Sequence, residues 1–314
     1  MSSETPPVNS PENSLFQSLL EDRRADRRWR NIRAGAWIVI LLLYSFFLFV
    51  SCSGPSQSTN EPYASAVQLN GLIAPGTSFS AKTVIPELQK AFADSKAKGV
   101  VLLINSPGGS PVQASIIHDK ILELKKQYKK KVIVVGEDAL ASGAYLVATA
   151  ADKIYVNPDT LTGSIGVIMN GFGFVDTMKK VGVTRRVFTA GDNKDRLDPF
   201  SELNPTDVSK IKGVLDQVHQ HFIQDVILGR GDRLKGDRKE LFSGDFWTGD
   251  QAVALGVADG TKNLWTALQD EFGVQYYKDY TDKPSLVKQI IGQGSTELRL
   301  NLLSRSSLIE ERAY

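Results

Sequence analysis

The chain has 314 residues, of which 42% are apolar and 23% are charged, so it can bury a sizeable core and form at most two ordinary domains. This composition gives no sign of wholesale disorder. With a formal net charge of only +2, the chain lacks the strongly basic character typical of proteins that bind polyanions, so we expect no nucleic-acid partner. The single cysteine, Cys52, excludes an intrachain disulfide and a metal site built from several cysteines. We expect neither a metal nor another cofactor.

The amino-terminal segment predicts a membrane anchor. Residues 34–52 form a run of 19 residues without a charge, which as a helix is long enough for the hydrocarbon core of a bilayer. Six arginines lie within residues 23–33, whereas residues 34–60 carry no charge. By the positive-inside rule, residues 1–33 form a disordered, basic, cytoplasmic tail. The part of the chain after a linker at 53–64 then lies on the far side of the membrane, which in a bacterium means the periplasm or the exterior of the inner membrane.

Two other interpretations of residues 34–52 remain possible, a cleaved signal peptide and a lipoprotein signal. A cleaved signal peptide is disfavoured because the apolar run exceeds the usual length and the leader before it is unusually long. A lipoprotein signal that ends at Cys52 is disfavoured because Phe49, Val50 and Ser51 are not the residues expected before a lipidated cysteine.

From residue 65 to 277 the pattern alternates between strands and helices, as in βαβ units. Continuous apolar runs such as GVVLLIN (99–105) are typical of strands that are buried on both faces of a parallel sheet. The elements predicted in chain order are a strand at 65–74, a helix at 81–98, a strand at 99–105, a helix at 111–128, a strand at 131–136, a helix that begins at Ser142 and a strand at 153–158.

The later part of the chain predicts one more such unit and a long helix. We expect a strand at 164–170, a helix at 174–181 and a strand at 185–191, followed by the loop GDNKDRLDPF. Apolar residues then recur at near-helical spacing over 205–228, which predicts an amphipathic packing or oligomerisation helix. Residues 278–314 form a carboxyl-terminal extension that we do not assign to the core.

Three loops that follow predicted strands are candidates for a site, because open α/β folds place their chemistry there. The first is the glycine turn at 106–110, the second surrounds Ser142, and the third carries Lys194. Each alone has an ordinary structural explanation: a turn needs glycine, serine is a common helix cap, and a loop lysine is usually solvated.

A nucleophilic serine needs a base, and the three histidines offer no obvious one. His118, His219 and His221 all lie on predicted helices, and none lies on a loop at the carboxyl edge of the sheet. A Ser-His-Asp triad is recognised by geometry and stays possible. The remaining bases on the candidate loops are lysines, and Ser-Lys pairs are an established variant.

Four segments, INSPGGS, DALASGAYLVATAADKIYVNPDTLTGSIGVI, the lysine in GDNKDRLDPF and FWTGDQAVALGVADG, resemble those of the signal peptide peptidase A family of membrane-bound serine proteases. The resemblance covers residues 67–271. It implies an α/β fold of stacked ββα units of the ClpP/crotonase type over 65–277, preceded by one transmembrane helix. It also implies a homo-oligomer in which neighbouring subunits share each site, and peptide substrates that are remnant signal peptides left in the membrane after secretion.

The resemblance assigns the site residues one by one. Ser142 matches the nucleophile and Lys194 the general base, while Ser164 matches the serine that hydrogen-bonds the lysine. Gly109 and Gly143 match the donors of the oxyanion hole. The function implied is that of a serine endopeptidase with a Ser/Lys dyad.

The chemistry imposes a condition on this dyad. The reference pKa of a lysine is about 10.4, and a base that works near neutrality needs it lowered by about 3 units, at a cost of roughly 4 kcal/mol. Burial lowers the pKa of a lysine, whereas a nearby carboxylate raises it. We therefore predict that Asp192, Asp195 and Asp198 point away from the amine of Lys194, and that Ser164 accepts its hydrogen bond.

Three alternatives belong to other classes of protein. A crotonase-type acyl-CoA enzyme shares the fold and the glycine turn, but it has no need of an anchor that faces away from the cytoplasm. A catalytically inactive scaffold would lack the serine or the lysine, and this chain has both. A membrane-surface binding module would need an exposed basic or aromatic patch.

Overall fold

A computed structural model describes residues 29, 32–47 and 61–282 of the chain. The described residues fall into two units, one that ends at residue 47 and one over 61–282, and each is described by itself. In the first unit, residues 32–47 are helical and their side chains are exposed. No helix among the described residues is both long enough and apolar enough to cross a bilayer. The last residues of the expected anchor, 48–52, lie outside the described residues, as do nearly all of the expected tail, most of the linker and residues 283–314.

One sheet of eight strands organises residues 61–282, in the order β6-β5-β3-β2-β1-β8, with β4 between β3 and β7. All neighbouring strands are parallel except β5 and β6. The strands are β1 (Tyr63–Asn70), β2 (Val100–Ser106), β3 (Val132–Ala141), β4 (Lys153–Val156), β5 (Leu161–Gly163), β6 (Phe246–Trp247), β7 (Gly260–Thr261) and β8 (Tyr276–Asp279). The first half of β3 pairs with β4 and its last residues pair with β5.

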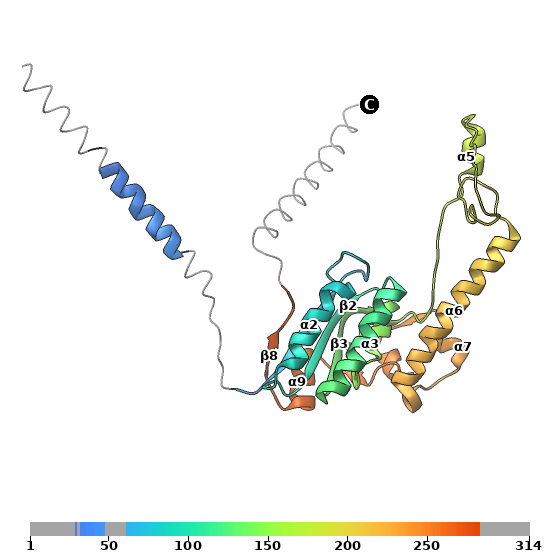
Figure 1. Ribbon diagram of the computed structural model, residues 1–314. Helices are drawn as coiled ribbons and strands as arrows, with labels where there is room; N and C mark the ends of the chain where they lie inside the picture. Colours follow the sequence, from blue (N-terminus) through green and yellow to red (C-terminus); the bar gives the residue numbers. More distant parts are fainter. Residues whose placement is uncertain (1–28, 30–31, 48–60, 283–314) are drawn as a thin grey trace, which may run out of the picture. The chain divides into compact units, whose positions relative to one another are not determined.

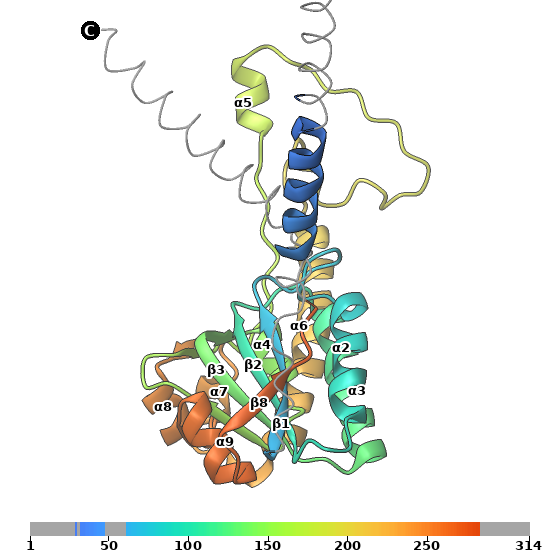
Figure 2. The same ribbon diagram turned by 90° about the vertical axis from the view of Figure 1, so that its left-hand side faces the viewer.

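Helices cover both faces of this sheet (Figure 2). Alternate residues of β2 face opposite cores: Leu102 joins the larger cluster under α2, α3 and α4, while Val101 and Leu103 join a smaller cluster under α9. The helices are α2 (Ala81–Ala93), α3 (Pro111–Tyr128), α4 (Gly143–Ala148), α5 (Val175–Lys180), α6 (Pro205–Arg230), α7 (Arg238–Leu241), α8 (Gly249–Ala254) and α9 (Leu264–Phe272), with a 3₁₀ turn at Gly231–Arg233. The described part of the chain is thus a mixed α/β sheet with helices, consistent with a ClpP-like fold.

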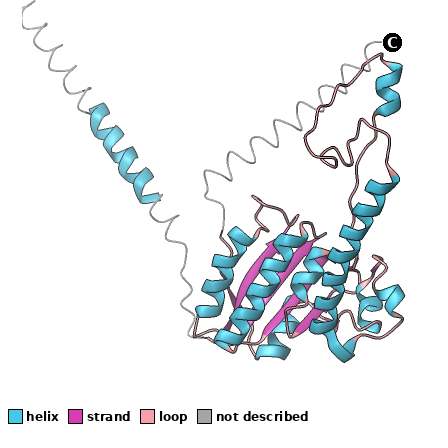
Figure 3. Ribbon diagram, turned by 45° about the vertical axis from the view of Figure 1, so that its right-hand side comes forward, coloured by secondary structure: helices cyan, strands magenta, loops and turns pink. Residues whose placement is uncertain are grey.

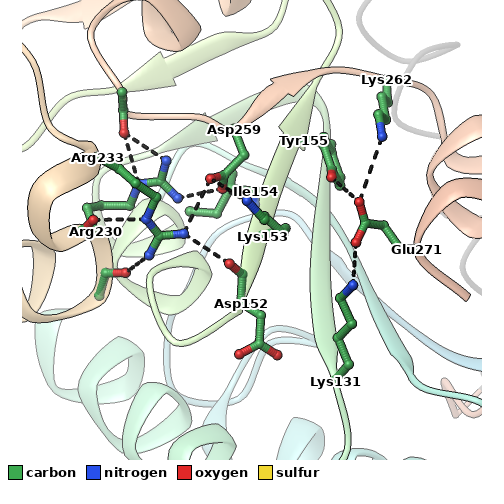
Figure 4. A network of polar contacts seen from close by, with 12 residues as sticks. Lys131, Asp152, Lys153, Ile154, Tyr155, Arg230, Arg233, Asp259, Lys262 and Glu271 are labelled. Carbon is green, nitrogen blue, oxygen red and sulfur yellow. Dashed lines mark hydrogen bonds and ion pairs between the residues drawn. The ribbon is translucent and has the colours of Figure 1, made fainter.

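The carboxyl end of α6 is fixed by a buried ion pair (Figure 4). The guanidinium of Arg230, which is 2% exposed, donates to Asp259 at 2.6 Å and to the carbonyl oxygen of Gly256 at 2.7 and 3.0 Å. Burial alone would raise the pKa of Asp259, but the hydrogen bond and charge of Arg230 outweigh it, so this pKa lies below its ordinary value. Arg233 makes a further ion pair with Asp259 at 3.3 Å. These contacts join α6 to the strand β4, because Asp259 also accepts from the N–H of Ile154.

A second polar cluster holds the end of α2 against the edge of the sheet. The carboxylate of Asp94 accepts hydrogen bonds from the hydroxyl groups of Tyr63 and Tyr280. Burial raises the pKa of Asp94, but the hydrogen bonds from Tyr280 and Tyr63 more than offset it and lower this pKa to about 2. This aspartate is therefore ionised throughout the neutral range.

Between β5 and α6, the chain leaves the sheet as a projecting segment, residues 167–204, which we call the arm (Figures 1 and 3). The arm carries α5, whose start is held by a hydrogen bond from the N–H of Phe174 to Pro199 and by stacking of Phe174 on Phe200 at 5.4 Å. Large apolar side chains of the arm are exposed: Ile168 by 85%, Phe172 by 82%, Phe188 by 93% and Leu203 by 74%.

Most of the predicted elements are confirmed, and two strands are wrong. The helix over 111–128 has the predicted bounds, and the long helix extends over Pro205–Arg230. Residues 164–170 and 185–191 form no strand. Both have the composition of strands, but they lie on or lead into the arm, where no described strand runs beside them to accept their hydrogen bonds.

Candidate active site

Ser142 lies at the sharp turn between β3 and α4. Its backbone has φ 53° and ψ −127°, a conformation that costs a residue with a side chain roughly 1–3 kcal/mol. Its N–H donates to the carbonyl oxygen of Gly163 at 2.7 Å, so the neighbouring strand β5 holds the turn in place. Strain of this kind is common where a side chain must be aimed at a substrate.

The hydroxyl group of Ser142 does not cap the helix that follows it. Ser142 occupies the N-cap position of α4, yet its side chain makes no capping hydrogen bond. Ser110, at the start of α3, does cap its helix by accepting from the N–H of Gln113. Ser142 is half-buried, and among the described residues its hydroxyl group has no hydrogen-bond partner. The ordinary explanation of this serine as a helix cap therefore fails.

The glycine turn after β2 packs directly against Ser142. A Cβ added to Gly108 would lie 2.7 Å from the Cβ of Ser142, and one added to Gly109 would lie 2.1 Å from the carbonyl oxygen of Ile73. Ile73 bridges the turn by donating to Gly108 at 2.8 Å and accepting from Ser110 at 2.7 Å. Glycine is needed here because no side chain fits, so the turn is held close to the serine.

Two backbone N–H groups beside Ser142 are free to bind an anion. Among the described residues, neither the N–H of Gly109 nor that of Gly143 donates to a protein acceptor. A Cβ on Gly143 would lie 3.5 Å from the nitrogen of Gly109, so the two glycines are immediate neighbours. Gly143 also opens α4, where the helix dipole favours negative charge. Unpaired donors of this kind match an oxyanion hole.

A cavity of about 360 Å³ opens beside Ser142, Gly109 and Gly143, between α3, α4, α6 and the start of the arm. Most of its wall is apolar. The apolar side chains that line it are Pro111, Val112, Ile116, Leu146, Val167, Ile168, Val218 and Phe222. The site therefore offers space for an apolar segment of a ligand next to the serine hydroxyl group.

Ser164 lies directly after β5, one residue beyond the partner of Ala141 in the register of β3 and β5. Its φ is 50°, its N–H donates to Asp245 at 2.8 Å, and its carbonyl oxygen accepts from Gly166 at 2.9 Å. Its backbone is thus held firmly, one strand away from Ser142. Its side chain does not line the cavity.

Lys194 lies on the arm and does not line the cavity. It is exposed, in a turn closed by its N–H to Gly191. Within the described residues it makes no ion pair, whereas Asp198 pairs with Arg185. The structure therefore brings together Ser142, Gly109 and Gly143, with Ser164 nearby, and leaves Lys194 apart within a single chain.

The sequence analysis considered His221 only as a possible base and did not consider Asp225, and it placed neither residue at the site. His221 and Asp225 line the cavity together with Val218 and Phe222. These four positions share one face of α6, because 221 and 222 follow 218 by three and four residues, and 225 follows 222 and 221 by three and four. The other two histidines are structural: His118 is 4% exposed beside Asp119, and His219 contacts the carbonyl oxygen of Ile165 at 2.9 Å. The helical spacing of positions 218, 221, 222 and 225 was the signal available in the sequence.

The chain matches two families of known proteins, both described as proteases or peptidases. The family described as "Peptidase family S49" matches residues 124–271, and the family described as "Clp protease" matches residues 66–162. The chain is 32% identical over 205 residues to the "Putative protease slr0021" of Synechocystis, covering 65% of this chain and 72% of that protein. It is 30% identical over 181 residues to the "Putative signal peptide peptidase SppA" of Enterococcus faecium, covering 58% of this chain and 52% of that protein.

A longer protein also matches two thirds of the chain. The chain is 42% identical over 212 residues to a Brucella melitensis protein named "Na(+)/H(+) antiporter NhaA", and the match covers 66% of this chain but only 29% of that protein. Both family models match segments that include Ser142. The chain belongs to peptidase family S49, the family of the signal peptide peptidase A proteins.

Proposed function

We propose that the chain is a serine endopeptidase in which Ser142 attacks the peptide carbonyl. The observation that carries this proposal is a strained serine beside the N–H groups of Gly109 and Gly143 at a cavity; within residues 61–282, neither its hydroxyl group nor these N–H groups have a hydrogen-bond partner. Membership in family S49 supports the same reaction class. A scaffold that had lost catalysis would have no reason to keep this strain.

The geometry supports a two-step acyl transfer. The oxygen of Ser142 attacks the carbonyl carbon as its proton passes to a base, and the N–H groups of Gly109 and Gly143 stabilise the oxyanion. The base then protonates the leaving amine as the peptide bond breaks. Water attacks the acyl-enzyme next and gives one proton to the same base. The base then returns this proton to the oxygen of Ser142 as the ester bond breaks, and the carboxylic acid product leaves.

We assign the base to Lys194, supplied by a neighbouring subunit, with Ser164 as its hydrogen-bond partner. A lysine works as a base only where burial disfavours its charge, and Lys194 is exposed in the single chain. The arm that carries it presents large apolar side chains to solvent, among them Phe172 and Phe188. Covering this apolar surface with a second copy of the chain would bury both the arm and the lysine.

We propose remnant signal peptides as the substrates and a bacterial inner membrane as the location. The apolar cavity beside Ser142 suits the apolar cores of such peptides. Residues 34–52 would anchor the chain as a single transmembrane helix with the amino terminus in the cytoplasm. The anchor would hold the site beside the bilayer, where these peptides are concentrated.

Hydrolysis of a fluorogenic peptide with an apolar, small-residue cleavage site tests the dyad on the detergent-solubilised full chain. We expect Ser142→Ala and Lys194→Ala to fold and to lose activity, while Lys180→Ala, a matched exposed lysine of the arm, keeps it. His221→Ala, which changes the only histidine among the cavity-lining residues, should also stay active. Full activity in Lys194→Ala, or loss of activity in His221→Ala, would show that a residue other than Lys194 is the base.

Mixed oligomers test whether the site is shared. Ser142→Ala and Lys194→Ala chains are co-expressed with different tags and purified as the mixed species. If serine and lysine come from different chains, some sites combine the intact Ser142 of one with the intact Lys194 of the other, and activity returns. Mixed oligomers that remain inactive would show that each chain completes its own site.

A further inference from the structure

Toward the carboxyl end of α6, beyond the residues that line the cavity beside Ser142, this helix packs closely against the end of α4. There α6 lies so close to α4 that a Cβ on Gly229 would lie 2.4 Å from the carbonyl oxygen of Thr149. Arg230 locks this end through Asp259. Phe222 and Val226, on the same side of the helix, are buried at 7% and 0% exposure. Asp225 is the last residue of α6 that lines the cavity, and beyond it the two helices are in close contact.

Asp225 is the cavity-lining residue of α6 that lies nearest to this helix contact. It precedes Gly229 by four residues, about 6 Å along the helix axis, whereas Val218 lies about 10 Å farther from the contact. Asp225 is half-buried and lines the cavity together with the apolar walls from α3 and α4. A carboxylate is thus placed on the side of the cavity that lies nearest to this helix contact, among largely apolar side chains.

The charge of Asp225 is not matched by a cation. Among residues 61–282, its carboxylate makes no ion pair and accepts no hydrogen bond from protein. The other polar side chains that line the cavity are Ser115, Ser142 and His221, and no lysine or arginine lines it. Because a charge between apolar walls interacts more strongly with an opposite charge than it does in water, this site favours a cationic ligand group.

We propose that Asp225 is a specificity-determining residue, which binds the ammonium or guanidinium group of a lysine or arginine side chain in the substrate. The methylene stem of that side chain would lie along the apolar walls, as such stems commonly do, with the charged head at Asp225. This inference rests on the proposed peptidase function. Signal peptides carry basic residues just before their apolar core, so such a site would direct cleavage toward that junction.

A matched peptide series tests the inference on the detergent-solubilised full chain. Each of the three residues before the scissile bond is replaced in turn by lysine, by norleucine, which keeps the stem without the charge, or by glutamate. We expect kcat/KM to be about tenfold higher for lysine than for norleucine at one position, and lowest for glutamate. Asp225→Asn should remove this preference by lowering kcat/KM for the lysine peptide alone. Asp225→Lys should reverse it, so that the glutamate peptide has the highest kcat/KM.

Asp216→Asn provides the control, because Asp216 is an exposed aspartate of the same helix that does not line the cavity. It should leave the lysine preference unchanged. Equal rates for lysine and norleucine peptides at all three positions, or an unchanged preference in Asp225→Asn, would overturn the inference while leaving the peptidase function in place.

Binding separates the inference from the chemistry. In the Ser142→Ala chain, fluorescence anisotropy measures the affinity of the labelled lysine and norleucine peptides without turnover. Adding Asp225→Asn to this chain should weaken binding of the lysine peptide about tenfold and leave the norleucine peptide unaffected. That result would support the basic subsite even if the hydrolysis assays ruled out the proposed reaction, and equal affinities would reject it.

Discussion

Replacing Ser142 by glycine should stabilise the chain while it abolishes activity. Ser142 has φ 53° and ψ −127°, a conformation that glycine adopts readily and that other residues adopt only at a cost. Ser142→Ala keeps the Cβ and therefore keeps the strain, so the two variants differ in strain while both lack the hydroxyl group. Since the hydroxyl group makes no hydrogen bond within the described residues, its loss should cost little.

The difference in free energy of unfolding between Ser142→Gly and Ser142→Ala follows from two opposing effects. Relief of the backbone strain gains roughly 1–3 kcal/mol. The greater freedom of glycine in the unfolded chain offsets about 0.4–1 kcal/mol of that gain. We expect Ser142→Gly to exceed Ser142→Ala by about 1–2 kcal/mol in free energy of unfolding, which for a domain of this size raises Tm by about 2–8 °C.

Thermal unfolding of the two variants, followed by circular dichroism alongside peptide hydrolysis, measures this difference. Lys129→Gly is the control, because Lys129 caps α3 with φ 52° in the left-handed region and lies outside the candidate site. It should gain stability without losing activity. A Ser142→Gly chain no more stable than Ser142→Ala would refute the view that this turn stores strain.

Three further predictions concern the framework around the site. Arg230→Leu removes the shortest ion pair of the buried Asp259, which keeps Arg233 at 3.3 Å, and it removes the donors to the carbonyl oxygen of Gly256. It should cost about 2–4 kcal/mol, measured by urea unfolding, and a cost below about 1 kcal/mol would contradict the role of this pair. The pKa of Asp94 is about 2 in the folded chain against an ordinary 3.8, so its contribution to stability is complete above about pH 5 and is lost as the pH falls toward 2. Asp94→Asn should flatten this part of the Tm profile between pH 6 and pH 2.5, and an unchanged profile would exclude Asp94 as its source. Gly163→Ala should destabilise the chain and reduce hydrolysis, because its Cβ would lie 2.5 Å from the ring of Trp247 beside the carbonyl group that holds Ser142; normal Tm and activity would show that the turn adapts.

Local signals in the sequence were sufficient for the central part of the fold. The helix Pro111–Tyr128 was predictable because a capping serine and a proline mark its start, and the strand Val100–Ser106 because its apolar run requires burial on both faces. The same reasoning failed at residues 185–191. A strand also depends on a neighbouring strand, and the sequence of one segment does not show whether such a neighbour exists.

The candidate site was predictable to the extent that its residues lie on adjacent strand ends. Ser142 and Gly109 meet because β2 and β3 are parallel neighbours, which the alternating pattern already indicated. His221 and Asp225 were missed because their approach to Ser142 depends on how α6 packs against α4, a long-range contact. The location of Lys194 could not be predicted at all, since the arm is not packed against the sheet in one chain.

The unbroken helix α6 ties the direction of the arm to the cavity. Each residue in a helix turns the chain by about 100° and advances it by 1.5 Å. Inserting one residue into the exposed half of α6 would therefore swing the arm to a different side, whereas inserting seven would turn it by about 700°, within 20° of two full turns, and would move it outward by about 10 Å. In proteins built on this plan, differences in the length of α6 that preserve the direction of the arm should thus come as three, four or seven residues, and not as one or two.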